Sequence, residues 1–264
     1  MSDQPAIQFT DGAGYERYMG TWSRLVGETF LDWLSSPPNL RWLDVGCGNG
    51  AFTERIIARC EPLAVDGIDP SEAQLAFART RPESRMATFH QGDAMALPYA
   101  DHTFDVAVMP LVIFFVPEPP RGVAEMARVV CPGGMVTAYA WDMTNGGFPY
   151  ESLLVEMRAL DLVIPAAPNP DASRTDAMID LWTSAGLVDI ETREISVQRT
   201  FASCDDYWAT IHMSPSVGRV LSSMPPDQHA ALKARMHAVL PIGSAGEITY
   251  SARANAVKGR RPSR

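Results

Sequence analysis

The stretch Trp42–Gly50, with the sequence WLDVGCGNG, limits the possible folds of this chain more than any other part of it. It begins as a short apolar run with strand propensity and then carries Gly46, Gly48 and Gly50. Because glycine has no Cβ, the backbone can turn sharply here and approach a ligand closely. Apolar residues recur at every fourth position from Phe52 to Cys60, which predicts a helix directly after the turn.

A strand, a glycine-rich turn and a helix in this order are typical of a nucleotide-binding site. The free N–H groups at the start of the helix point out of the turn, where they can bind a ligand. A tight turn without any ligand is the alternative, but three glycines within five residues exceed what such a turn requires.

An acidic residue follows the next predicted strand. This strand covers Leu63–Ile68 and is followed by Asp69, 19 residues after Gly50. Ser71 and Gln74 then have the spacing of a capping box at the start of a helix. In doubly wound folds, an acid at the carboxyl end of the second strand accepts hydrogen bonds from a ribose diol. The alternative is a simple turn residue, but the position of Asp69 after this glycine loop favours a role in ligand binding.

Further strands and helices alternate along the chain. Strands are predicted at residues 86–91, 104–109 and 135–141, and a helix around residues 123–130 is expected to end at the sequence PGG, residues 132–134. The connection between the first two of these strands is too short for a long helix. Strands and helices alternate five times, which predicts a doubly wound α/β fold with a parallel sheet and helices on both faces.

Two segments, residues 142–171 and 199–246, break this alternation, and each contains one predicted helix. An insertion that leaves the fifth strand starts at the carboxyl edge of the sheet, where open parallel sheets bind their ligands. We therefore expect a helical lid over this edge, with a lining that suits a largely apolar molecule. The alternative is that the same residues only pack the insertions onto the sheet. The apolar residues considered for this lining are Phe148, Leu153, Leu154, Met157, Leu160, Tyr207, Trp208, Ile211 and Met213.

The predicted domain division places residues 1–39 in an N-terminal arm and helix, and residues 40–264 in the main domain with its two insertions. In the N-terminal part, the rings of Tyr18 and Trp22 precede the main sheet. They could cover a bound ligand or face a cation, but packing in the core explains such residues equally well. A final strand is predicted at residues 248–257 from its strict alternation.

Composition excludes several classes of function. The chain has 264 residues, of which 46% are hydrophobic, enough for a full core. A net charge of −9 and a pI near 5.0 exclude a basic track for nucleic acid. No apolar run reaches the roughly 18 residues of a membrane span, and the first residues lack the features of a signal peptide, so a cytoplasmic location is expected. Four cysteines form no CxxC pair, and no cluster of His, Cys, Asp and Glu has the spacing of a metal site, so no metal is expected.

Four segments carry a resemblance to a known family. They are LDVGCGNG, GIDPSEAQLAFAR, QGDAMALPYADHTFDVAV and ARVVCPGG. In this order and spacing they resemble the class I S-adenosylmethionine (SAM)-dependent methyltransferases, specifically the small-molecule branch near the quinone-biosynthesis C-methyltransferases. The resemblance extends from about Leu40 to Trp141. It implies a Rossmann-like sheet of seven strands, mostly parallel with an antiparallel last strand. It also implies SAM as the cofactor, an enzyme of the class EC 2.1.1.- and a small-molecule acceptor.

The same resemblance assigns residues to parts of the cofactor. It implies that Gly46 and Gly48 line the methionine part of SAM and that Asp69 binds the ribose hydroxyls. It also implies that Asp93 and Ala94 hold the adenine. The full set of expected cofactor-binding residues is Tyr18, Trp22, Asp44, Gly46, Gly48, Asp69, Pro70, Asp93, Ala94, Met109 and Pro110.

Met109 and Pro110 are expected to close the site. Many members of the family carry a small polar residue at the position of Pro110. No side-chain contact to the amino-acid part of SAM is therefore expected there.

An NAD-linked oxidoreductase is the main alternative, because a glycine loop followed by a distant acid occurs in both classes. Dinucleotide sites favour GxGxxG, whereas Gly46, Gly48 and Gly50 form GxGxG. Asp44 and Asp93 have no role in the dinucleotide pattern, which favours the methyltransferase. A protein that binds SAM without catalysing a reaction is a third hypothesis, and turnover with any acceptor would exclude it.

No catalytic residue is predicted. Methyl transfer is an in-line displacement at a sulfonium, and proximity and alignment can supply most of its rate without a nucleophile on the enzyme. His212, in the second insertion, is the best candidate for a general base, although a structural role is the stronger expectation for it. The sequence leaves open the acceptor, the atom that is methylated, any general base and the oligomeric state.

Overall fold

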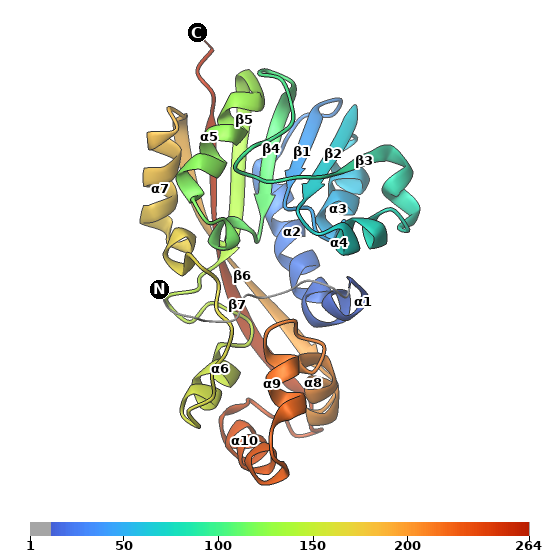
Figure 1. Ribbon diagram of the computed structural model, residues 1–264, viewed down its shortest axis with the longest axis vertical. Helices are drawn as coiled ribbons and strands as arrows, with labels where there is room; N and C mark the ends of the chain where they lie inside the picture. Colours follow the sequence, from blue (N-terminus) through green and yellow to red (C-terminus); the bar gives the residue numbers. More distant parts are fainter. Residues whose placement is uncertain (1–11, 264) are drawn as a thin grey trace.

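The computed structural model of the protein describes residues 12–263 (Figure 1). Residues 1–11, the first part of the predicted N-terminal arm, and the terminal Arg264 lie outside the described residues. The strands are β1 (Arg41–Val45), β2 (Ala64–Asp69), β3 (Ala87–Gln91), β4 (Phe104–Pro110), β5 (Val130–Trp141), β6 (Val188–Phe201) and β7 (Ile248–Arg260).

All seven strands belong to one sheet, in the order β3-β2-β1-β4-β5-β7-β6. The pairs among β1 to β5 are parallel, whereas β7 runs antiparallel to both β5 and β6. This arrangement confirms the predicted doubly wound sheet, including its antiparallel last strand.

Helices cover both faces of the sheet. On one face α2 (Thr21–Leu34) contacts α3 (Ala51–Cys60), and α5 (Pro119–Val129) contacts α7 (Thr175–Ser184) on the other (Figure 1). Right-handed crossovers explain this, because the chain moves through α3 and through α5 in opposite directions along the sheet. As predicted, residues 92–103 between β3 and β4 contain no helix. The remaining helices are α1 (Gly12–Tyr15), the π-helix η1 (Glu16–Gly20), α4 (Glu72–Ala78), η2 (Pro82–Met86), η3 (Ile113–Phe115), α6 (Glu151–Arg158), η4 (Pro170–Ser173), α8 (Cys204–Ile211), α9 (Val217–Ser223) and α10 (Pro226–Val239).

The strand order reverses between β1 and β4. From β1 the chain continues to β2 and β3 on one side, and from β4 it continues to β5 on the other. Ligands of open α/β sheets bind in the crevice outside the carboxyl ends of the strands at such a point. The loops that follow Val45 and Pro110 therefore meet at the expected place for a ligand.

The last two strands extend beyond the rest of the sheet. In Figure 1 the β6–β7 pair continues downward, and α8, α9 and α10 lie at its far end together with α6; we call these four helices the lower lobe. The pairing continues to Phe201 opposite Ile248. The second insertion therefore begins after Phe201 and not at Arg199. An ion pair of 2.5 Å between Arg235 of α10 and Glu156 of α6 joins the two insertions.

The predicted boundary between α5 and β5 is wrong. The sequence PGG, residues 132–134, lies inside β5, which begins at Val130 directly after the helix. Val130 pairs with Phe104 of β4, and the register shifts directly after this pair. A Cβ on Gly134 would lie 2.7 Å from the carbonyl oxygen of Asp105. The glycine thus permits the close approach of two strands, and it does not end a helix.

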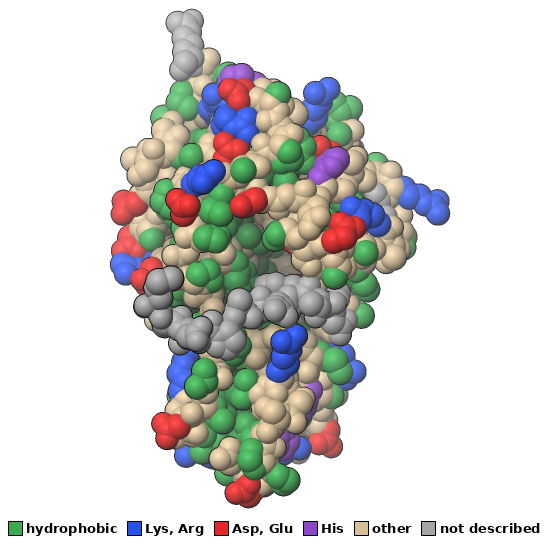
Figure 2. Space-filling model, in the orientation of Figure 1, with side chains coloured by type: hydrophobic (Ala, Val, Ile, Leu, Met, Phe, Trp, Pro, Cys, Tyr) green, Lys and Arg blue, Asp and Glu red, His purple; other side chains and the backbone are tan. Residues whose placement is uncertain are grey.

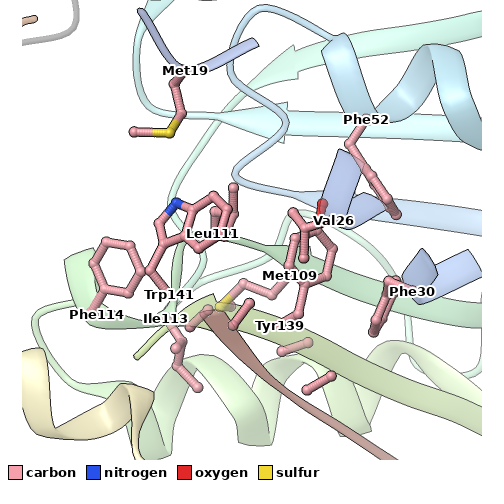
Figure 3. Close-up of a cluster of buried hydrophobic side chains, with 14 of the residues drawn as sticks. Met19, Val26, Phe30, Phe52, Met109, Leu111, Ile113, Phe114, Tyr139 and Trp141 are labelled. Carbon is pink, nitrogen blue, oxygen red and sulfur yellow. The ribbon is translucent and has the colours of Figure 1, made fainter. Parts of the chain in front are cut away.

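The helix α2 packs directly on the sheet. Val26 and Phe30 are fully buried. The ring of Phe30 lies 4.5 Å from the ring of Tyr139 in β5 and 6.1 Å from that of Phe52 in α3. Figure 3 shows these side chains in one cluster with Met109. None of the described helices has the length and apolar character needed to cross a membrane.

Candidate active site

The glycine loop after β1 is shaped by the segment that packs on it. Gly46 has a φ of +75°, and its N–H donates to the carbonyl oxygen of Ile68 at 2.7 Å. A Cβ at this position would lie 2.5 Å from the side chain of Val112, just beyond β4. Only glycine therefore allows the loop after β1 and the segment after β4 to approach each other this closely.

Asp69 connects this loop to the next helix. Its Oδ2 accepts a hydrogen bond from the N–H of Gly48 at 2.9 Å, and its Oδ1 accepts one from the N–H of Ser71 at 2.8 Å. Burial raises the pKa of Asp69, and the two backbone donors oppose this shift. Each oxygen of an ionised carboxylate can accept a further bond, so both remain able to bind hydroxyl groups of a ligand. Ser71 also caps α4, because its hydroxyl accepts from the N–H of Gln74.

A cavity of about 350 Å³ lies against the glycine loop, and we call it the loop cavity. Five of the predicted cofactor-binding residues line it: Gly46, Gly48, Asp69, Pro70 and Pro110. The lining residues that sequence reasoning did not identify are Ser23, Cys47, Asn49, Ala51, Phe52, Ser71, Gln74, Leu111, Val112, Phe115 and Tyr139. They come from α2, from the segments after β1, β2 and β4, and from the end of β5. Cys47, Asn49, Ser71 and Gln74 lie within the quoted segments LDVGCGNG and GIDPSEAQLAFAR, whereas Ser23, Phe115 and Tyr139 lie in none of the four quoted segments.

The other predicted residues lie outside this lining. Met109 and Trp22 are fully buried in the core. Asp93 lies just beyond β3, where its Oδ1 accepts from the N–H of Met95 at 2.8 Å, and Ala94 follows it. Their roles toward a cofactor stay predictions.

Asp44 lies beneath the glycine loop and is fully buried. Its Oδ2 accepts a hydrogen bond from the hydroxyl of Thr53 at 2.7 Å, while its Oδ1 has no hydrogen-bond partner among the described residues. Burial, with a smaller contribution from the charge of Asp69, raises the pKa of Asp44 to about 7. Asp44 does not line the loop cavity, so its predicted role in cofactor binding stays a prediction.

A second cavity of about 590 Å³ adjoins the first, and we call it the apolar cavity. Its walls come from η1, the segment after β4, the end of β5, the first insertion and a short part of the second. The lining residues are Tyr18, Met19, Leu111, Phe114, Phe115, Trp141, Met143, Thr144, Phe148, Glu151, Leu154, Arg158, residues 162–167, Pro170, Pro215 and Ser216. The charged lining residues Glu151 and Arg158 form an ion pair of 2.9 Å with each other.

Leu111 and Phe115 line both cavities, which adjoin at these two residues. Leu111 has a φ of +59°, a left-handed conformation that costs roughly 1–2 kcal/mol for a residue with a Cβ. Its N–H donates to the carbonyl oxygen of Tyr139 at 2.7 Å, which holds this conformation. Figure 3 shows Leu111 between Trp141 and Met109. Backbone strain of this kind concentrates at functional sites.

The π-helix η1 connects the glycine loop to the apolar cavity. At its beginning, an oxygen of Glu16 accepts from Asn49 at 3.1 Å and from Arg81 at 2.6 Å. In the middle of η1, the carbonyl oxygen of Tyr18 accepts from the hydroxyl of Tyr150 at 2.8 Å. Tyr18, predicted to cover a ligand, lines the apolar cavity and does not line the loop cavity.

The lining of the apolar cavity differs from the sequence-based expectation. Of the residues considered for the lid, only Phe148 and Leu154 belong to it. Trp208 packs against other residues of the lower lobe, with its ring 5.7 Å from that of His229. His212 lines neither cavity, and burial, together with the charges of neighbouring His229 and Lys233, lowers its pKa. The irregular apolar run 162–167, LVIPAA, was the missed signal.

The surface around this site is not basic. On the face drawn in Figure 2, the described Lys and Arg side chains are interspersed with Asp and Glu. No group of three or more described His, Cys, Asp or Glu residues has the arrangement of a metal site.

Comparison with known proteins agrees with this geometry. Residues 43–138 match the family described as "Methyltransferase domain". Over 171 residues the chain is 33% identical to the demethylmenaquinone methyltransferase of Renibacterium salmoninarum, covering 62% of this chain and 64% of that relative. It is 36% identical over 115 residues to the ubiquinone/menaquinone biosynthesis C-methyltransferase UbiE of Roseobacter denitrificans, covering 42% of this chain and 46% of that relative. The chain therefore matches about half to two thirds of the length of these curated relatives.

A solved structure shows the same fold. Phosphoethanolamine N-methyltransferase 2 of Haemonchus contortus, in complex with phosphomonomethylethanolamine and S-adenosylhomocysteine, superposes with a TM-score of 0.58 at 16% identity. The superposition covers 94% of this chain and 57% of that chain. At this identity the likeness concerns the fold alone.

Proposed function

We propose that the protein, whose residues 43–138 belong to the methyltransferase domain family, transfers a methyl group from SAM to a small, largely apolar acceptor. The observation that carries this proposal is that two cavities adjoin at Leu111 and Phe115, which line both. One cavity has the polar groups that a nucleoside needs, and the other has the apolar lining that a hydrophobic acceptor needs.

The loop cavity has the donors and acceptors that suit SAM. Asp69 retains lone pairs for ribose hydroxyls, and it is held in place by Gly48 and Ser71. No described atom lies within 4 Å of the position that a Cβ on Gly48 would take, so the backbone there is open to close approach by the amino-acid part. When bound, SAM supplies an electrophilic methyl group on a positively charged sulfur.

The residues of the chain would hold the two reactants in position and exclude water from them. Leu111 and Phe115 line both cavities, so a donor in one cavity and an acceptor in the other would meet beside these two side chains. Holding two reactants in line can supply several kcal/mol of the barrier reduction, about 7–11 kcal/mol in the best cases. We name no general base, because His212, the candidate from the sequence, lines neither cavity.

The acceptor should be neutral as well as apolar. Glu151 and Arg158 neutralise each other in the lining, and the remaining lining residues carry no charge. Demethylmenaquinone in its reduced form is the first acceptor to test, because it is named in the description of the relative from Renibacterium salmoninarum.

The two insertions are proposed to act as a lid on the main domain. The first insertion supplies most of one wall of the apolar cavity, and the second supplies Pro215 and Ser216. The Arg235–Glu156 ion pair links the two, so they are expected to move together.

The test of the cofactor assignment is calorimetry with three ligands. SAM and S-adenosylhomocysteine are expected to bind, because Asp69 and the GxGxG loop suit a single nucleoside. NAD is expected not to bind, since the loop lacks the GxGxxG spacing for a pyrophosphate. Binding of NAD without binding of SAM would support the oxidoreductase and overturn the proposal.

The test of the acceptor site compares two residues of the same helix. Leu154 lines the apolar cavity, whereas Met157 is fully buried and does not. Leu154→Ala is expected to lower kcat/KM for reduced demethylmenaquinone by about 5- to 30-fold, because it removes apolar contact with the acceptor. Its Kd for SAM should not change.

Met157→Ala is the matched control, and it should lower the melting temperature without a selective loss of acceptor turnover. Equal kinetic effects of the two substitutions would contradict the apolar cavity as the acceptor site.

A further inference from the structure

Trp141 carries a polar group that no described residue satisfies. It is the last residue of β5, only 1% of it is exposed, and it lines the apolar cavity. Its indole Nε1 is buried and has no hydrogen-bond partner among the described residues. In Figure 3 the nitrogen lies on the side of the ring that faces Met19, another residue of the cavity wall.

Two other buried tryptophans satisfy the same group. Trp22 Nε1 donates to the hydroxyl of Tyr150 at 3.3 Å, and Trp182 Nε1 donates to the carbonyl oxygen of Val136 at 2.9 Å. Leaving a buried donor unpaired costs about 1–3 kcal/mol, so most native structures provide a partner. Trp42 Nε1 is also unpaired, but Trp42 lies on β1 and lines neither cavity. The cavity is therefore what distinguishes Trp141.

We propose that Trp141 Nε1–H donates a hydrogen bond to an oxygen of the acceptor and selects apolar molecules that carry a hydroxyl or carbonyl group over bare hydrocarbons. This inference rests on the proposed function, because it assumes that the apolar cavity holds the acceptor. It makes Trp141 a specificity-determining residue and assigns it no part in proton transfer.

Because of the position of Trp141, this hydrogen bond would also orient the acceptor in the cavity. Trp141 ends β5, which pairs with β4. In this pairing Pro110 of β4 lies opposite Tyr139, and Tyr139 precedes Trp141 by two residues. Leu111, which follows Pro110, lines both cavities. An oxygen held by Trp141 would therefore lie near the place where the cavities adjoin, and the oxygen-bearing end of the acceptor would face the methyl donor.

The remaining lining strengthens the effect. The lining residues around Trp141 in Figure 3, namely Met19, Leu111 and Phe114, are apolar. A hydrogen bond in such a low-dielectric environment is stronger than one in water, and a ligand without an oxygen leaves the donor unpaired. Discrimination by a site of this kind exceeds what an apolar pocket achieves by shape alone.

The experiment uses 1-naphthol and naphthalene as probes, which differ by one hydroxyl group, and measures their binding by ligand-observed NMR. Trp141→Phe keeps an aromatic ring and removes the N–H. It is expected to weaken 1-naphthol roughly tenfold and to leave naphthalene unchanged. The matched control Trp42→Phe makes the same substitution away from both cavities, and it should change neither affinity.

A second measurement needs no variant. The indole N–H proton of Trp141 should move downfield when 1-naphthol is added to the parent protein, and that of Trp42 should not move. Equal loss of both probes in Trp141→Phe, an unchanged preference for 1-naphthol, or no binding of either probe to the parent would overturn the proposal. These tests require no SAM, so they fail or succeed independently of the calorimetry on the cofactor.

Discussion

The stability of the Asp44→Asn variant is expected to fall much less than that of the parent as the pH rises. Asp44 is fully buried, and burial raises its pKa from 3.8 to about 7. Because the folded pKa lies above the unfolded one, the contribution of this group is fully present below about pH 4 and is lost as the pH rises through 7. The pKa difference corresponds to a loss of about 2–3 kcal/mol between pH 5 and pH 8.

Urea unfolding of the parent and the variant between pH 5 and pH 8 measures this effect. The asparagine oxygen can still accept from Thr53, so the variant keeps the hydrogen bond that Asp44 makes. As the pH rises, the free energy of unfolding of the variant should therefore increase relative to that of the parent. Parallel pH profiles would show that Asp44 does not titrate as its burial implies.

The Asp69→Ala variant is expected to bind SAM more weakly by about 1.5–3 kcal/mol, which is roughly a 10- to 150-fold increase in Kd. The substitution removes the acceptor for ribose hydroxyls. It also releases the N–H groups of Gly48 and Ser71, which the carboxylate holds. The structure thus adds a positioning role to the ligand-binding role predicted from the sequence.

Asp66→Ala is the matched control for this measurement. Asp66 lies on the same strand three residues earlier, is also partly buried, and lines neither cavity. Calorimetry should show a parental Kd for SAM in Asp66→Ala, and thermal melting should show that both variants remain folded. A folded Asp69→Ala protein with a parental Kd would mean that the ribose role is assigned to the wrong residue.

The sheet and the loop cavity were predictable because their signals are local. The glycines of WLDVGCGNG predict a backbone conformation that residues with a Cβ rarely adopt, and Gly46 does have a left-handed φ. Asp69 is the last residue of β2 and precedes a capped helix, which places it at the carboxyl edge of the sheet. Regular strand and helix periods then allow only a few topologies.

The lining of the apolar cavity could not be predicted in the same way. Apolar identity does not distinguish a residue that lines a cavity from one that fills the core: Leu154 lines the cavity, and Met157 on the same helix is fully buried. The run 162–167 belongs to no helix or strand, so its apolar residues show no helical or strand periodicity from which their positions could be predicted. Trp141 could be placed at the end of its strand from the sequence, but its unpaired nitrogen depends on contacts far along the chain.

The antiparallel insertion of β7 between β5 and β6 has a consequence for the order of folding. Thr137 of β5 donates to the carbonyl oxygen of Val257, a contact across 120 residues. During synthesis, β5 and β6 therefore each have one edge with unpaired backbone groups until β7 is available. Such edges are aggregation-prone, and pairing over so many residues is slow. These two edges stay without their β7 partner until residues 248–260 have been synthesised.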